Sequence, residues 1–228
     1  KGAFYECSKL KGSLDIRNSS YFKSTDNVDY SSRRTNLCTV DDYAFYKCSG
    51  FDGFLTIQYI RTIGKYAFYS CSGFKGSLII PFNDYRFSYQ IENNYYNYDD
   101  NNIIGEYAFY GCSSFDGNLY LGNVEKIEKY AFYGCKGFIG SLSLPSSLDY
   151  IGDYAFYECS GFTNDLSISY NAYYIGAYSF SGCTGLNQTL NIAGSCSLEI
   201  GRGAFNSTNR EELNYKSHRK MNLITEKL

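Results

Sequence analysis

One nine-residue motif recurs along the whole chain and constrains the fold more than any other feature of the sequence. Its clearest copy, from Ile151 to Cys159, reads Ile-Gly-Asp-Tyr-Ala-Phe-Tyr-Glu-Cys. Self-similarity at a period of a few tens of residues is typical of solenoids, in which each repeat packs only on its neighbours. The other near copies centre on Phe4, Phe45, Phe68, Phe109, Phe132, Phe180 and Phe205.

The motif predicts one short helical turn per repeat with a single apolar face. At about 100° per residue, Ala155, Phe156 and Cys159 fall on one face of a helix. Tyr154 and Tyr157 fall together on the opposite face. A strand would instead place the adjacent Ala and Phe on opposite faces. We therefore expect Ala, Phe and Cys to face the core and both Tyr to face outward, with the motif glycine allowing a tight entry.

A Leu-x-Ile alternation follows each motif and is clearest from Leu166 to Ile168. This pattern predicts a short strand with one buried face. One such strand per repeat would build a parallel sheet along one side of the molecule. In the turn that follows, Leu148 is expected to dip back into the core before Ile151 restarts the cycle. The predicted fold class is a repeat solenoid of the leucine-rich-repeat type, with short helical or irregular turns on the other side.

The spacing of the motifs locates two insertions. Successive motif phenylalanines are 41, 23, 41, 23, 24, 24 and 25 residues apart. The excess falls between the strand and the next motif in the first and third coils, so both insertions are expected to leave the same edge. We predict a solenoid of about eight coils over residues 1–207, with insertions at 17–39 and 82–103.

Residues 208–228 are expected to form a cap or a tail. Thr208-Asn209-Arg210-Glu211 fits a capping box, which predicts a terminal helix from Glu211 to Leu228 that shields the open end. A solenoid needs such a lid because its last coil has no neighbour. A frayed basic tail is the alternative.

Seven of the nine cysteines occupy the same motif position. Stacked coils would align them in a column with a rise of about 4.8 Å and parallel side chains. A disulfide needs Cβ atoms about 3.8 Å apart that face each other, so we expect buried free thiols. Pairs that include Cys38 or Cys196 are the alternative. A metal site is disfavoured because the chain has no CxxC motif and His218 is its only histidine. The column is Cys7, Cys48, Cys71, Cys112, Cys135, Cys159 and Cys183.

Charge and composition argue against several functions. The 21 basic and 23 acidic side chains nearly balance and form no basic stripe, so no nucleic-acid partner is expected. No apolar run reaches the roughly 20 residues of a membrane span, so no direct membrane insertion is expected. Convergent acid, base or nucleophile groups are absent from the motifs, which predicts a non-enzymatic protein without a cofactor.

Outward tyrosines form the first candidate binding surface. Successive coils would stack them into columns, and an exposed aromatic strip often marks an interface, here with a protein partner or a second copy of the chain. The alternative is that the rings only lean on each other and cover the core. The motif residues assigned to binding are Tyr66, Tyr69, Tyr107, Tyr110, Tyr130 and Tyr133.

The second insertion is the other candidate, because long loops in compact domains are usually functional or disordered. Its tyrosines lie among asparagines, a composition typical of either a disordered polar loop or an adhesive one. The outward columns of the sheet are mainly small and polar, with exceptions such as Ile79 and Tyr120, and look poorly suited to tight binding. The insertion residues assigned to binding are Tyr85, Tyr89, Tyr95, Tyr96 and Tyr98.

The segment from Pro145 to Cys159 resembles the BspA-like, or Treponema-type, leucine-rich repeat family. Its Ile-Gly-x-x-Ala-Phe-x-x-Cys core carries the likeness, which covers nearly all of residues 1–205 apart from the insertions. The sequence departs from the family in its Phe-x-x-x-Leu spacing and in the two insertions. The chain starts inside a motif copy, so we expect it to be part of a longer protein.

The resemblance implies a non-enzymatic scaffold for protein interaction and adhesion. Members of this family are typically large surface or secreted proteins that bind host proteins or neighbouring cells. Cell-surface or secreted localisation is therefore expected. The alternative is an intracellular structural scaffold of the cytoskeletal type, in a cytoplasmic compartment that would keep the thiols free.

Overall fold

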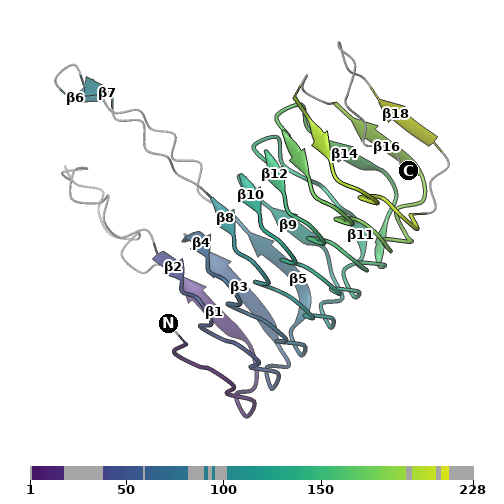
Figure 1. The fold of residues 1–228 in the computed structure, drawn as a ribbon. Coiled ribbons are helices and arrows are strands. Elements are labelled where there is room, and N and C mark those ends of the chain that lie inside the picture. The colour runs from purple at the N-terminus through teal and green to yellow at the C-terminus, as the bar shows by residue number, and fades with distance from the viewer. Residues whose placement is uncertain are drawn as a thin grey trace.

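The computed structural model is a solenoid of coils stacked along one axis (Figure 1). The structure describes residues 2–17, 38–58, 60–81, 90–91, 94–95, 102–193, 197–208 and 212–215. These residues form strands and turns and contain no helix. All pairings between strands of different coils are parallel, which confirms the predicted repeat solenoid.

The predicted Leu-x-Ile strands form one side of the solenoid. Their register pairs apolar residues of one coil with apolar residues of the next, as in Leu78 beside Leu119 and Ile80 beside Leu121. The buried face therefore continues from coil to coil. Leu148 is also buried, as predicted. The strands that carry the pattern are β1 (Leu14–Arg17), β3 (Phe54–Gln58), β5 (Lys75–Ile80), β9 (Leu119–Leu121), β14 (Leu166–Ile168) and β16 (Thr189–Ile192). Two further strands, β11 (Gly140–Ser141) and β13 (Phe162–Thr163), pair with each other just before the pattern, and β18 (Glu212–Tyr215) extends the sheet of β14 and β16.

A second parallel sheet, which the sequence analysis did not predict, lies on the other side of the core. Each strand ends on the isoleucine or valine that opens a motif, for example Ile127 beside Ile151. Most of these strands are two residues long, too short for an alternation to be visible in the sequence. The strands are β2 (Cys38–Val40), β4 (Ile60–Ile63), β8 (Ile103–Ile104), β10 (Lys126–Ile127), β12 (Tyr150–Ile151), β15 (Tyr174–Ile175) and β17 (Glu199–Ile200).

The rest of the motif forms consecutive tight turns, so the predicted helical turn is wrong. The Tyr157 N–H donates within the turn to the Tyr154 carbonyl at 3.2 Å, but the Phe156 N–H donates to Ser179 in the next coil at 2.7 Å. In a helix both N–H groups would bond within the same segment. Successive N–H groups point alternately into their own turn and toward the next coil, because Tyr154 and Glu158 both adopt φ +56°. Bonding between coils therefore replaces helical bonding.

The predicted inward face of the motif is confirmed. Ala155, Phe156 and Cys159 have no exposed surface. Motif phenylalanines of successive coils stack with centroids 5.1–5.4 Å apart and planes within 8° of parallel. Each buried ring contributes about 1.5–3 kcal/mol of hydrophobic stabilisation. Because the first coil has no preceding neighbour in the structure, Phe4 is 44% exposed.

The column cysteines are free, as predicted, and six are buried. Each buried thiol donates to the carbonyl of the motif phenylalanine in the preceding coil, with Sγ–O distances of 2.7–3.1 Å. The thiols therefore point at the backbone and not at each other. The side chain of Cys38 and the whole of Cys196 lie outside the described residues, so their predicted alternatives are untested.

Two rows of glycine allow the close approach of successive coils. A Cβ on Gly152 would lie 2.5 Å from the Lys129 nitrogen, and one on Gly161 would lie 2.2 Å from the Phe138 oxygen. Real Cβ atoms essentially never come this close to backbone atoms. Where the motif has glycine, the neighbouring coil leaves no room for a side chain, whereas the sequence analysis attributed the glycine to a tight turn within its own coil. Asp41 and Glu128 occupy the same position in two other coils.

The two insertions begin at the same edge of the solenoid. β1 and β5, which precede them, flank β3 in one sheet. Within the second insertion, β6 (Gln90–Ile91) and β7 (Asn94–Tyr95) pair antiparallel. The other predictions for 17–39 and 82–103 fall mainly on residues outside those described.

At the C-terminal end, β18 pairs in parallel with β16. The expected helix is therefore wrong at residues 212–215, and the residues after them lie outside the described part of the chain. Leu213 pairs with Leu190 and Tyr215 with Ile192, so this segment adds a further strand to the sheet by tertiary pairing. No helix in the described residues has the length and apolar character needed to span a membrane.

Replacing the glycines tests the close approach of the coils. We expect Gly161→Ala to destabilise the chain by about 3 kcal/mol or more, because its Cβ would overlap backbone oxygens. Gly134 is the matched control, since a Cβ there meets nothing within 4 Å and only the φ of +69° opposes it. Gly134→Ala should cost about 1 kcal/mol. Urea unfolding measures both, and equal costs would contradict the close approach.

Thiol reactivity tests the cysteine column. Burial raises the pKa of the Cys71, Cys112 and Cys135 thiols, so little reactive thiolate forms in the folded chain. In a Cys38→Ser, Cys196→Ser background, we expect a thiol reagent to label half-buried Cys7 rapidly and the six buried column thiols only after unfolding. Rapid labelling of Cys135 in the folded protein would contradict the column.

Candidate functional site

Two columns of motif tyrosines run along the turn edge of the solenoid. We call these twelve side chains the Tyr strip. It contains all six motif tyrosines assigned to binding from the sequence, and apart from Tyr5, which is half exposed, its members are partly buried. The first column is Tyr43, Tyr66, Tyr107, Tyr130, Tyr154 and Tyr178, and the second is Tyr5, Tyr46, Tyr69, Tyr110, Tyr133 and Tyr157.

The rings of the Tyr strip stack face to face. Centroids are 4.6–5.2 Å apart in the first column and 4.7–5.0 Å apart in the second. The columns also touch, for example where Tyr107 lies tilted 5.8 Å from Tyr110. No strip hydroxyl in the described residues is buried without a hydrogen-bond partner. The ring faces are therefore covered by neighbouring rings, and the edges and hydroxyls remain for a partner.

The first column holds its tyrosines in an unfavourable backbone conformation. All six have φ between +54° and +59°, which costs about 1–2 kcal/mol per residue. The equivalent residues of the first and last motifs are Gly2 and Gly203, which adopt this φ freely. The N–H bond to the next coil, such as Tyr66 to Glu106 at 2.9 Å, offsets part of the cost. This backbone conformation does not favour tyrosine, so the reason for tyrosine at these positions lies in its ring, which stacks on the rings of neighbouring coils.

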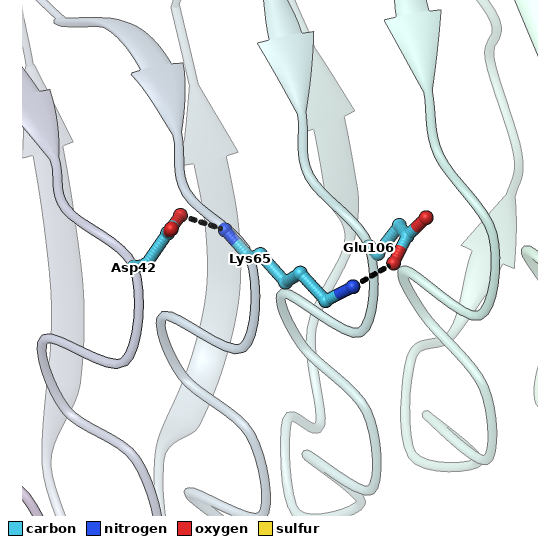
Figure 2. A network of polar contacts seen from close by, with 3 residues as sticks. All are labelled: Asp42, Lys65 and Glu106. Atoms are coloured by element: carbon cyan, nitrogen blue, oxygen red, sulfur yellow. Dashed lines mark hydrogen bonds and ion pairs between the residues drawn. The ribbon is translucent and has the colours of Figure 1, made fainter.

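Charged residues of alternating sign border the first column. Figure 2 shows Asp42, Lys65 and Glu106 in three successive coils: Asp42 accepts the Lys65 backbone N–H at 2.8 Å, and the Lys65 ammonium pairs with Glu106. The same ammonium lies 5.5 Å from the Tyr66 ring centroid. Exposed pairs of this kind contribute at most about 1 kcal/mol each. This border is nearly neutral and favours no strongly charged partner.

The outward face of the first sheet carries hydrophobic side chains that the sequence analysis left out of the site. Phe54, Ile79 and Tyr120 are 60%, 51% and 50% exposed. Ile79 lies beside Tyr120 in the β5–β9 register, and the Phe54 ring lies over Gly76 of the next coil. The signal was present in the sequence, because these residues interrupt columns that are otherwise small and polar.

The predicted tyrosines of the second insertion fall mainly on residues outside those that the structure describes. The second insertion starts after β5, at the strand end opposite the motif turns (Figure 1). Tyr85, Tyr89, Tyr96 and Tyr98 lie outside the described residues, and for Tyr95 only the backbone position in β7 is described. Within the described ranges, no cluster of three or more His, Cys, Asp or Glu side chains could hold a metal ion.

Burial makes the phenols of the Tyr strip harder to ionise. Desolvation raises the pKa of Tyr66, Tyr107 and Tyr133, and neighbouring tyrosines add to the effect. Beside the strip, desolvation and a 3.1 Å hydrogen bond to Asp153 raise the pKa of Tyr174 to about 12. The strip is therefore a neutral phenolic surface at physiological pH.

These shifts predict loss of stability at alkaline pH. An unfolded tyrosine ionises near pH 10 and these folded tyrosines ionise above it, so the folded state binds more protons in that window. The contribution of the tyrosines to stability should be constant below about pH 10 and fall between about pH 10 and 12, on top of the loss that the buried thiols cause from about pH 9. Melting temperatures measured with phenolate absorbance test this, with the urea-unfolded chain as the control. Ionisation of Tyr174 near pH 10 in a folded chain would contradict it.

Two solved leucine-rich repeat structures are similar to this chain. A crystal structure of a leucine-rich repeat protein from T. pallidum superposes with a TM-score of 0.52 at 19% identity, covering 75% of this chain and 70% of that one. A leucine-rich cell surface protein from Faecalibacterium prausnitzii A2-165 matches with a TM-score of 0.39 at 15% identity, covering 90% of this chain and 69% of that one. No curated protein matches.

The sequence also matches a family model. The BspA type leucine rich repeat region matches residues 1–91 and 102–226 in six copies. This match spans most of the chain and includes the motifs that build both sheets. The chain belongs to the BspA-type leucine-rich repeat family.

Proposed function

We propose that this chain is a non-enzymatic scaffold for protein interaction, part of a larger surface or secreted protein, and that it docks a protein partner along the Tyr strip. The supporting observation is the strip itself, a regular row of partly exposed tyrosines on a rigid array of coils. Tyrosine is enriched at protein interfaces because its ring packs while its hydroxyl bonds. Membership of a repeat family whose coils build extended surfaces supports the same role.

The geometry of the strip constrains how the partner binds. Because neighbouring rings cover each other's faces, a ligand cannot lie flat on a single ring. It can contact ring edges and hydrogen-bond to hydroxyls that repeat at each coil, with stacked centroids 4.7 Å apart for Tyr107 and Tyr130. A protein surface with several polar groups in a row meets this requirement. The tyrosines of the second insertion, Tyr85 to Tyr98, are a further part of the proposal.

An intracellular structural scaffold is the alternative. Free thiols were its main support, since a reducing compartment preserves them. In this fold each buried column thiol is held against a phenylalanine carbonyl, so its free state follows from packing in any compartment. The thiols therefore do not favour the intracellular alternative over the surface role.

A hydroxyl deletion tests the docking surface. Tyr69→Phe, Tyr110→Phe and Tyr133→Phe together keep the stacked rings and remove three hydroxyls from the second column. Each lost hydrogen bond is worth about 0.5–1.5 kcal/mol, so binding should weaken at least tenfold. The measurement is attachment of beads coated with the chain to cultured cell monolayers, with protease-treated cells showing that the partner is a protein.

Ile79→Ser with Phe54→Ser is the matched control on the sheet face and should leave attachment unchanged. If this pair abolishes attachment and the tyrosine triple variant does not, the docking surface is the sheet and not the strip. Circular dichroism melting curves of each variant separate lost contact from lost fold. Attachment that persists on protease-treated cells would remove the protein partner from the proposal.

A further inference from the structure

We propose that the Tyr strip is a site of oxidative cross-linking, where tyrosines of adjacent coils couple into dityrosine bridges that lock the solenoid covalently. This proposal concerns the chemistry of the strip and does not depend on a docking partner. The reagent class is a one-electron oxidant, such as hydrogen peroxide activated by a haem peroxidase.

The spacing of the rings provides a coupling partner at every step. Tyr107 and Tyr130 have centroids 4.7 Å apart with planes 16° from parallel, and Tyr110 and Tyr133 are 4.7 Å apart at 9°. Interior members of each column have such a neighbour on both sides. A tyrosyl radical formed at any coil therefore lies beside a second phenol that can be oxidised in turn.

The coupling reaction balances with the named oxidant. Each phenol loses one electron to the oxidant and its hydroxyl proton to water, which leaves a radical shared with the ring carbons beside the oxygen. Two such carbons form a new C–C bond, and each then gives up its hydrogen as a proton while its oxygen regains one. In sum, one hydrogen peroxide and two tyrosines give one dityrosine and two waters. The partly exposed ring edges and hydroxyls give the oxidant and water access.

The composition of the chain leaves tyrosine as the main target of such an oxidant. The sequence has 26 Tyr, no Trp and one Met, so the side chains that usually compete are almost absent. The buried column thiols donate to backbone carbonyls beneath the strip and are shielded from solvent. Half-buried Cys7 is the competing thiol of the column, so the oxidation is done on a Cys7→Ser background. Radicals that reach the Tyr strip end on a tyrosine that lies next to another tyrosine.

A bridge would join residues that are distant in sequence. Tyr107 and Tyr130 belong to successive coils, so one bond closes a loop through a whole coil. Successive bridges along a column would staple the array and oppose the separation of coils that unfolding requires. The consequence is a solenoid that becomes harder to unfold after exposure to an oxidising environment.

The test is oxidation of the dilute folded chain with a haem peroxidase and hydrogen peroxide. We expect dityrosine fluorescence, a mass loss of two hydrogens per bridge, and digest peptides joining Tyr107 to Tyr130 or Tyr110 to Tyr133. The product should stay monomeric and melt at a higher temperature. The same treatment in concentrated urea removes the stacking and should lower the yield of these pairs at least tenfold.

Two variants make the test specific. Tyr107→Phe with Tyr110→Phe preserves the stacks and should eliminate all bridges to that coil. Tyr120→Phe with Tyr170→Phe removes tyrosines that are 50% and 66% exposed, outside the columns, and should leave the bridges unchanged. The proposal is overturned if dityrosine forms only between molecules, only among insertion tyrosines, or equally in urea.

Discussion

Hydrogen bonds between successive coils are the interaction on which the rest of this structure depends. In the motif turns every second N–H donates to the next coil, as Phe132 does to Ala155 at 2.7 Å. The parallel strand pairings continue the same ladder on the other sides of the core. This ladder stacks equivalent residues of successive coils directly above each other. The columns of Phe, Tyr and Cys are consequences of the ladder.

The ladder also explains why the motif uses residues that would be unusual elsewhere. Coils this close leave no room for a Cβ at Gly152 or Gly161. The motif phenylalanine carbonyl already accepts the N–H of the cysteine in its own coil at 3.1–3.3 Å, and a carbonyl has a second lone pair. The cysteine thiol of the next coil donates its hydrogen bond to this second lone pair. Cysteine is small enough for the column and still has a proton to donate, which alanine lacks.

The same stacking decides what the surface can offer to other molecules. Rings that stack at 4.6–5.2 Å cover each other's faces, so the Tyr strip acts as a continuous row of edges and hydroxyls and not as separate aromatic platforms. The short distance between stacked rings favours oxidative coupling of neighbouring tyrosines as much as contact with a partner. On the sheet face, Phe54, Ile79 and Tyr120 stand apart because the residues around them are small and polar.

The sequence by itself determined the repeat, the inward Ala, Phe and Cys, the free thiols, the Leu-x-Ile sheet and the outward tyrosines, because each follows from local spacing. Only the tertiary structure decided that the motif forms turns and not a helix, that a second sheet exists, and that residues 212–215 join β16. It also decided that the tyrosine faces are covered. These features depend on partners one coil away, commonly 23 or 24 residues and in two cases 41. Hydrogen bonds over that separation leave no trace in local periodicity.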